Sequence, residues 1–409
     1  MNKRIALKTY AKINISLDVT GVRADGYHEV EMVMQGIDLY DEMTVRCLPS
    51  DQPRITVKTD KFYIPTDERN TAFKAARLMR EKCRIPQCEI RIDIKKQIPV
   101  AAGLAGGSSN AAGVILALNY LCGLGLTLEE MCSLGGMTGA DVPFSIMLAA
   151  HENPDLGIKG GAACALAQGT GVELTPLKTS ELWVTLAKPP VGASTRAVYT
   201  ELDKLDSYPR PDNANCIKAI GDADLKLLEK SMANSLEAVT ENMVPQVGQL
   251  KALLVEAGGA VNEETSSEPG RAEGKPESYL DLKNESSPTA DPGMKNENSP
   301  TSISTRRTAN ALKSEPSPKN EGNPPADPAL KNEASTTADP GIKSGTGSAA
   351  DPALYSESSP ASDPIMMSGS GPTVYGIYAD RNRAEKVFEY MKSHVEDPKT
   401  ELFCVKMLV

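Results

Sequence analysis

The stretch PVAAGLAGGSSN, residues 99–110, is the part of the sequence that best indicates the fold class. It follows residues 89–95, where three isoleucines alternate with polar residues as on a half-buried strand. Apolar residues then recur between Val114 and Leu121 and predict a helix. A strand, a glycine-rich turn and a helix in this order bring backbone N–H groups and the positive end of a helix to one point. The sequence therefore predicts a binding site for an anion such as phosphate.

The two serines of this stretch allow two interpretations. Ser108 and Ser109 could add hydroxyl groups to a phosphate or to a bound Mg²⁺ ion. Alternatively, the loop is a glycine-rich turn in which a serine only caps the helix. The spacing PxxxGLxGGSS is restrictive, and it is neither the Walker loop nor the dinucleotide-binding fingerprint.

The remaining flanks of the chain carry both helix and strand patterns. Residues 12–19 alternate, with Ile13 and Ile15 on one face and Lys12 and Asn14 on the other, which predicts a half-buried strand. Strands and helices interleave without the repeated βαβ rhythm of a Rossmann sheet, which favours an α+β sandwich. The other expected elements are helices at 70–82 and 384–394, a capping box at 127–130, and strands at 373–378 and 402–408.

Composition excludes several classes of protein. The formal charge of the 409 residues is 44 − 54 = −10, which argues against a nucleic-acid partner. No apolar run approaches the roughly 18 residues of a membrane span. The eight cysteines have no paired CxxC spacing. We therefore expect an enzyme with reduced thiols that acts in the cytoplasm and does not contact membranes.

Residues 262–364 differ from the rest of the chain. They are rich in Ser, Pro, Ala, Asn, Glu and Lys and follow a twelve-residue period, in which Asp327, Asp339, Asp351 and Asp363 recur. Such units offer few apolar residues around a proline, so they cannot bury enough surface to offset their ordering entropy. We expect a low-complexity, disordered insertion, rather than a folded repeat domain. Its two flanks should lie close together.

A second glycine loop, MSGSGPT at residues 367–373, runs into an expected strand. With the first loop, in this order, it resembles the GHMP kinases, the superfamily of galactokinase, homoserine kinase and mevalonate kinase. AKINI at 11–15, GVRADGYHE at 21–29 and TGADVPF at 138–144 resemble the branch that phosphorylates a cytidine diphosphate-linked methylerythritol. The resemblance covers residues 5–261 and 365–409, with small departures at Gln168 and 161–165.

The resemblance implies a two-domain GHMP kinase fold. Its N-terminal ATP-binding domain, like the second domain of a small-subunit ribosomal protein, would span residues 1–158. A ferredoxin-like C-terminal domain would span 159–261 and 365–409. The implied reaction is ATP-dependent phosphorylation of the 2-hydroxyl of the acceptor in the non-mevalonate isoprenoid pathway, with Mg²⁺. The alternatives are another GHMP kinase, acting on homoserine, mevalonate or a sugar, and a non-catalytic nucleotide-binding regulator.

The resemblance also implies roles for individual residues. Lys12 and Asp141 would be catalytic, with Asp141 the base; from local sequence alone, Asp141 could equally be a helix cap. Asn14, Tyr27 and His28 would contact the acceptor, the last two at the cytosine. The loop at 189–195 resembles a second substrate-side loop, but could be a proline-rich connector. The expected ATP-binding residues are Pro99, Val100, Ala101, Ala102, Gly103, Leu104, Ala105, Gly106, Gly107, Ser108 and Ser109. The resemblance assigns no definite metal ligand, although Ser109 could contact a bound Mg²⁺ ion. The enzyme would be a monomer or a homodimer.

Overall fold

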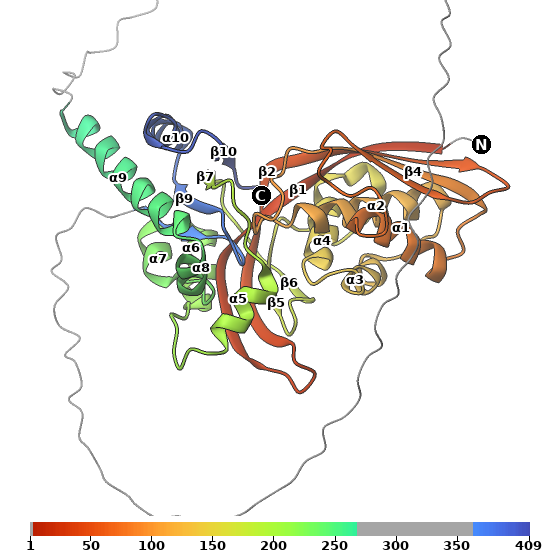
Figure 1. The fold of residues 1–409 in the computed structure, drawn as a ribbon, viewed down its shortest axis with the longest axis horizontal. Helices are drawn as coiled ribbons and strands as arrows, with labels where there is room; N and C mark the ends of the chain where they lie inside the picture. Colours follow the sequence, from red (N-terminus) through yellow and green to blue (C-terminus); the bar gives the residue numbers. More distant parts are fainter. Residues whose placement is uncertain (1–2, 268–362) are drawn as a thin grey trace, which may run out of the picture. The chain divides into compact units, whose positions relative to one another are not determined.

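The computed structural model describes residues 3–267 and 363–409, and side chains as far as Asn262 and from Asp363 onward. All of these residues fall within one compact unit. The predicted repeat insertion lies almost wholly outside the described residues. The α+β class is confirmed: the described chain forms two sheets, with helices packed on them (Figure 1).

The first sheet has six strands in the order β3-β4-β2-β5-β6, with β1 along the other edge of β2. All neighbours are antiparallel except β3 and β4. Its strands are β1 (Lys3–Val22), β2 (His28–Pro49), β3 (Ile55–Thr59), β4 (Cys88–Lys95), β5 (Cys164–Gln168) and β6 (Glu173–Pro176). This sheet extends past the predicted domain boundary at 158, because β5 pairs with β2.

Four helices cover one face of this sheet. They are α1 (Thr71–Lys82), α2 (Gly106–Cys122), α3 (Leu128–Gly136) and α4 (Val142–Glu152), followed by the short 3₁₀ helix η1 (Pro154–Leu156). Asn70 caps α1 through a hydrogen bond from the Ala72 amide, and the capping box of Thr127 and Glu130 is present, as the sequence predicts. Helix α2 is apolar nearly all round, because it is buried against the sheet and against α1 and α4.

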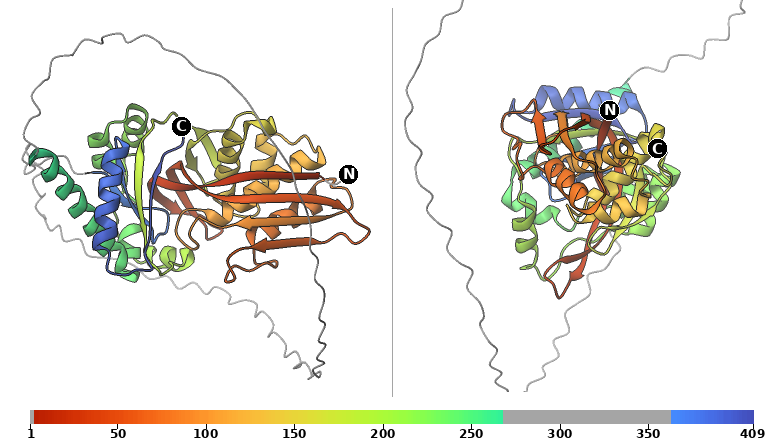
Figure 2. Two further views of the ribbon diagram at one scale, coloured as in Figure 1. Left: turned by 90° about the horizontal axis from the view of Figure 1, so that it is seen from above. Right: turned by 90° about the vertical axis from the view of Figure 1, so that its right-hand side faces the viewer.

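The second sheet is antiparallel, in the order β10-β7-β9-β8. Its strands are β7 (Trp183–Lys188), β8 (Ile365–Met367), β9 (Val374–Tyr378) and β10 (Glu401–Lys406). The helices around it are α5 (Thr195–Leu202), α6 (Asn213–Asp222), α7 (Leu225–Ser231), α8 (Glu237–Met243), α9 (Gln246–Ser267) and α10 (Arg381–His394). Helices α9 and α10 lie next to each other beside this sheet (Figure 2). Their side chains pack on one face of the sheet, and those of α6 and α7 pack on the other.

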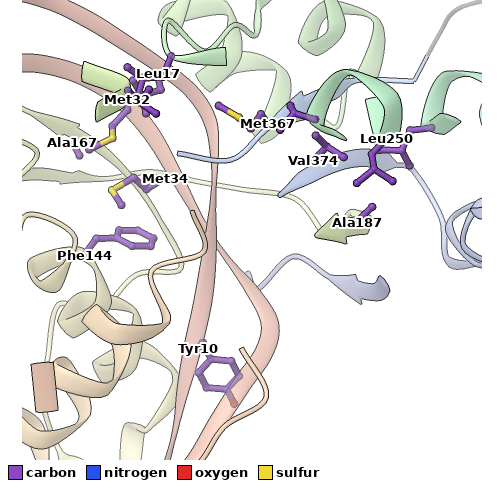
Figure 3. Packing of buried hydrophobic residues seen from close by; sticks show 14 of the residues in the cluster. Tyr10, Leu17, Met32, Met34, Phe144, Ala167, Ala187, Leu250, Met367 and Val374 are labelled. Atoms are coloured by element: carbon purple, nitrogen blue, oxygen red, sulfur yellow. The ribbon is translucent and has the colours of Figure 1, made fainter. Parts of the chain in front are cut away.

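One hydrophobic cluster joins the two sheets. It runs from Phe144 of α4, across Met34 of β2, to Val374 of β9 and Leu250 of α9 (Figure 3). Because these side chains are buried together, the sheets share a core and are not separated by a linker.

The two ends of the predicted insertion meet at one guanidinium group. Arg383 of α10 donates to both carboxylate oxygens of Asp363, at 2.9 and 2.7 Å, and to Oδ1 of Asn262 at 2.8 Å. The flanks therefore lie side by side, as predicted. The folded chain also reaches into the predicted insertion at both ends, since α9 continues to Ser267 and Asp363 belongs to this ion-paired contact.

Candidate active site

A pocket of about 1050 Å³ lies where the two glycine loops, the β1–β2 hairpin and the start of α4 converge. Its walls come from segments far apart in the sequence, among them the loop at 99–108, Gly369–Gly371 and Asp141. Most of the predicted site residues line it together. The exceptions are Leu104, which is buried, and Ser109.

The first glycine loop has the backbone that an anion site needs. Ala101, Gly103 and Ala105 all have positive φ angles, of 51°, 76° and 58°. Gly103 must remain glycine, because a Cβ atom there would lie 2.1 Å from the carbonyl oxygen of Ser368. This close approach holds the two glycine loops against each other.

The N-terminus of α2 faces the pocket without a side-chain cap. Helix α2 begins at Gly106, and its N-cap residue Ala105 makes no side-chain hydrogen bond, so the interpretation in which a serine only caps the helix is wrong. Gly106, Gly107 and Ser108 line the pocket. The Ser109 hydroxyl instead donates to the Tyr10 carbonyl of β1. Of the two serines, Ser108 is the one placed to meet a ligand.

Lys12 and Asp141 lie close to each other in the wall of the pocket. The Lys12 ammonium lies 3.9 Å from Oδ2 of Asp141 and donates to Oδ1 of Asn14 at 2.6 Å. The Lys12 backbone N–H donates to the Leu104 carbonyl at 3.2 Å, which ties β1 to the first glycine loop. Burial lowers the pKa of Lys12, and the Asp141 carboxylate opposes this shift.

The carboxylate of Asp141 is only lightly engaged. Asp141 is the N-cap residue of α4, but its side chain makes no capping hydrogen bond. The side chain is 33% exposed, against 4% for Lys12. On the pocket wall, burial and the charge of Asp141 raise the pKa of Tyr199 to about 12, so Tyr199 remains protonated at neutral pH. Asp141 therefore retains hydrogen-bonding capacity for a ligand.

The polar face of β1 differs from the sequence prediction of a half-buried strand. Lys12, Asn14, Ser16 and Asp18 are all buried. They are covered because this face meets the pocket and the segment before α6, where Arg210 donates to both oxygens of Asp18. Alternation correctly gives the strand, but it cannot show what covers its polar side.

The turn between β1 and β2 carries the two predicted cytosine contacts. Tyr27 lines the pocket and is 67% exposed. His28 is more enclosed: its Nε2 lies 2.7 Å from Oδ1 of Asp203, and its ring packs 4.5 Å from that of Tyr199. Asp203 and Tyr199 thus fix the orientation of the imidazole next to the open tyrosine.

Several pocket residues were not identified from the sequence. Lys96 lines the pocket beside Gly106 and pairs with the buried Asp41. Thr195 also lines it, with its hydroxyl 2.8 Å from that of Ser370. The resemblance of residues 189–195 to a substrate-side loop is the sequence signal for Thr195. Lys96 follows a strand as an ordinary surface lysine does, and nothing local marks it.

Comparisons with known proteins agree with this geometry. The family model described as GHMP kinases N terminal domain matches residues 70–148, and the one described as GHMP kinases C terminal matches residues 362–397. The chain is 45% identical over 257 residues to 4-diphosphocytidyl-2-C-methyl-D-erythritol kinase of Alkaliphilus metalliredigens, which covers 62% of this chain and 82% of that protein. The corresponding protein of Brevibacillus brevis is 43% identical over 258 residues, with the same coverage.

This chain belongs to the 4-diphosphocytidyl-2-C-methyl-D-erythritol kinase family. Solved structures agree on the fold. A crystal structure of 4-(cytidine 5'-diphospho)-2C-methyl-D-erythritol kinase matches with a TM-score of 0.59 and 20% identity, over 98% of this chain and 99% of that one. The mevalonate kinase of L. major in complex with R-mevalonate matches with a TM-score of 0.55 and 12% identity, over 99% and 96%. The predicted GHMP kinase fold is confirmed.

Proposed function

We propose that this kinase transfers the γ-phosphoryl group of ATP to the 2-hydroxyl of 4-diphosphocytidyl-2-C-methyl-D-erythritol, a step of isoprenoid precursor synthesis. The observation that carries the proposal is the Lys12–Asp141 pair, 3.9 Å apart, between two glycine loops and the Tyr27–His28 turn. The glycine loops suit phosphates, and the Tyr27–His28 turn suits a planar base. The family relationship supports this acceptor over homoserine, mevalonate or a sugar.

Asp141 is the proposed base. Its partly exposed carboxylate can accept the proton of the acceptor hydroxyl as that oxygen attacks phosphorus. A carboxylate is a weak base, but the transition state of phosphoryl transfer is loose, so positioning and charge neutralisation dominate. Lys12 supplies the charge: its ammonium faces Asp141 and lies beside Gly369 of the second loop.

The phosphate chain would lie on the N-terminus of α2. The amides of Gly106, Gly107 and Ser108 belong to its first turn, where N–H groups have no partner within the helix. We propose residues 99–109, the set predicted from the sequence, as the ATP-binding residues, with Leu104 and Ser109 supporting the loop from behind.

Mg²⁺ fits this site as a partner of the nucleotide. Among the described residues, no group of three or more His, Cys, Asp or Glu side chains could hold a metal. Mg²⁺ commonly keeps several waters and binds through phosphates with one or two protein oxygens. The Ser108 hydroxyl lines the pocket and would take that role, and the ion would offset charge on the phosphates.

The acceptor's base would lie between Tyr27 and His28. The exposed ring of Tyr27 offers a face for stacking, and the imidazole, fixed by Asp203, offers polar atoms to a base edge. Asn14, held by Lys12, would contact the polyol. We propose that the enzyme acts in the cytoplasm, as a monomer or a homodimer. Among the helices of residues 3–267 and 363–409, none combines the length and the apolar character of a membrane span.

One assay tests the proposed function. The purified full-length chain, with ATP and Mg²⁺, is given the cytidine substrate, mevalonate, homoserine or galactose in parallel, and ADP release and the phosphorylated product are measured. We expect turnover with the cytidine substrate alone. Turnover with another acceptor would assign a different kinase, and ATP binding without turnover on any acceptor would support a regulator.

A further inference from the structure

Thiols from three elements meet at the end of α2 away from the pocket. Cys122 is the last residue of α2, and its Sγ lies 4.0 Å from Sγ of Cys47 on β2. Cys88 of β4 lies one diagonal step from Cys47, since Cys47 pairs with Ile90 and Cys88 with Pro49. Among the described residues, no group of three or more His, Cys, Asp or Glu side chains is placed to hold a metal ion.

The two closest thiols have unequal acidity. A hydrogen bond from Cys47 lowers the pKa of Cys122 to about 7 against the opposing effect of burial, and the charge of Lys3 lowers it further. Lys3 also donates to the Leu121 carbonyl at 2.7 Å, which offsets the negative end of the helix. The same hydrogen bond, followed by burial, raises the pKa of Cys47. At neutral pH, Cys122 therefore carries a larger fraction of thiolate than Cys47.

Access to the pair is also unequal. Cys122 is partly exposed beside Gly123, whereas Cys47 is buried behind it. A small oxidant from solvent therefore reaches Cys122 first, with a second thiol in contact behind it. A reactive thiolate next to a resolving thiol is the arrangement of a redox-sensing pair.

We propose that Cys122 and Cys47 form a reversible disulfide under oxidation by a peroxide. The Cys122 thiolate attacks hydrogen peroxide; an S–O bond forms, the O–O bond breaks, and hydroxide leaves as water after taking a proton. Cys47 then attacks the Cys122 sulfur, so that the S–S bond forms, the S–O bond breaks, and a second water carries away the Cys47 proton. Two thiols are oxidised and one peroxide is reduced to two waters. A dithiol reverses the step.

The cross-link would stabilise the fold rather than stop catalysis. It joins residues 122 − 47 = 75 positions apart, and a loop of that length gives a large entropic gain in the chain-entropy account. The sulfurs must move about 2 Å closer to reach bonding distance. Gly106 lies at the opposite end of the helix, so kcat should stay within about twofold.

The experiment treats the full-length chain with hydrogen peroxide at pH 7.5, alkylates the remaining thiols, and maps peptides by mass spectrometry. We expect a Cys47–Cys122 peptide, a fall in titratable thiols from 8 to 8 − 2 = 6, and a melting temperature higher by roughly 4–8 °C. Dithiothreitol should restore all three. A cross-link between another pair, or no cross-link, would overturn the proposal.

Single variants separate the two roles. Cys47→Ser removes the resolving thiol, so a Cys122 sulfenic acid should accumulate and react with dimedone, whereas Cys122→Ser should give neither product. Cys404→Ser, in β10 and outside the cluster, is the matched control and should behave like the wild type. Equal dimedone labelling of Cys122 and Cys404 in the Cys47→Ser protein would show that Cys122 has no special reactivity.

Discussion

Two lysine–aspartate pairs line or support the same pocket, and they are built differently. In the pair of Lys96 and Asp41, both side chains are buried and every carboxylate oxygen is occupied. Oδ1 of Asp41 accepts the amides of Gln97 and Ile98, and Oδ2 accepts Lys96 and Asn110. In the pair of Lys12 and Asp141, the charges stand 3.9 Å apart and the carboxylate is one-third exposed.

The difference separates support from chemistry. A buried carboxylate whose acceptor sites are filled has nothing left to offer a substrate, and it fixes the strands that donate to it. Asp41 thereby anchors the backbone that precedes the first glycine loop. The open pair instead keeps a cation and an acceptor available, which is what a proton transfer and a charged phosphoryl group require. The first pair should govern stability, and the second should govern turnover.

Asp141→Asn tests the open pair and has the largest expected effect. The amide keeps the shape but cannot accept a proton, so kcat should fall by about 10²–10⁴. The melting temperature and the affinity for ATP should hardly change, because the side chain caps nothing. Steady-state kinetics and calorimetry measure both quantities. A variant with near-full turnover would show that Asp141 is not the base.

Asp41→Asn tests the closed pair. An amide placed among four donors leaves some of them facing N–H groups, and breaking a buried pair costs about 3–5 kcal/mol. The melting temperature should fall by about 5–10 °C, while kcat of the folded protein stays within about tenfold. The matched control is Asp93→Asn, since Asp93 pairs with Arg46 at the surface and should shift the melting temperature by less than about 2 °C. Equal shifts in melting temperature would mean that the closed pair stabilises the fold no more than a surface pair does.

Sequence reasoning found the open pair and missed the closed one, for a physical reason. Lys12 and Asp141 stand in motifs whose spacing and residue types are restrictive, so their resemblance to GHMP kinases could identify them. Asp41 lies inside a strand and Lys96 just after another, and each reads locally as a solvated charge. Their pairing depends on how β2 and β4 align, which is a tertiary property.

The same limit applies to the fold. Local periodicity located β4, α1 and α10 to within a few residues, because the pattern of each element is set by the residues of that element alone. It could not show that β5 returns to the first sheet, nor that the polar face of β1 is buried. Both outcomes depend on contacts with distant segments. Composition identified the insertion, but not the exact residues at which the folded chain resumes.

His28→Ala separates the acceptor wall of the pocket from the open pair. Removing the imidazole should raise KM for the cytidine substrate about tenfold, and leave KM for ATP within a few fold, because its polar atoms face the acceptor side. His394→Ala is the matched control: that ring stacks on Tyr390 in α10, so both constants should be unchanged. A parallel rise in both constants after His28→Ala would make the turn structural.

The smallest effect is expected from removing residues 268–362, which tests a third pair. Arg383 donates to both carboxylate oxygens of Asp363, and Asn262 accepts from the same guanidinium. These contacts hold the two flanks together without any contribution from residues 268–362. Closing a flexible loop costs only about 0.6 kcal/mol more for each doubling of its length, so shortening the loop should change the free energy of unfolding little.

The deletion should be closed with six glycine and serine residues, which can reach about 20 Å, and it must spare Asp363 and the loop at 367–373. We expect kcat/KM within a few fold of the full-length enzyme and an unchanged or higher melting temperature. Arg383→Gln in the full-length chain supplies the contrast: it leaves Asp363 with a weaker partner and should lower the melting temperature by a few degrees. A soluble, folded deletion that has lost activity would show that the removed residues contribute to the site.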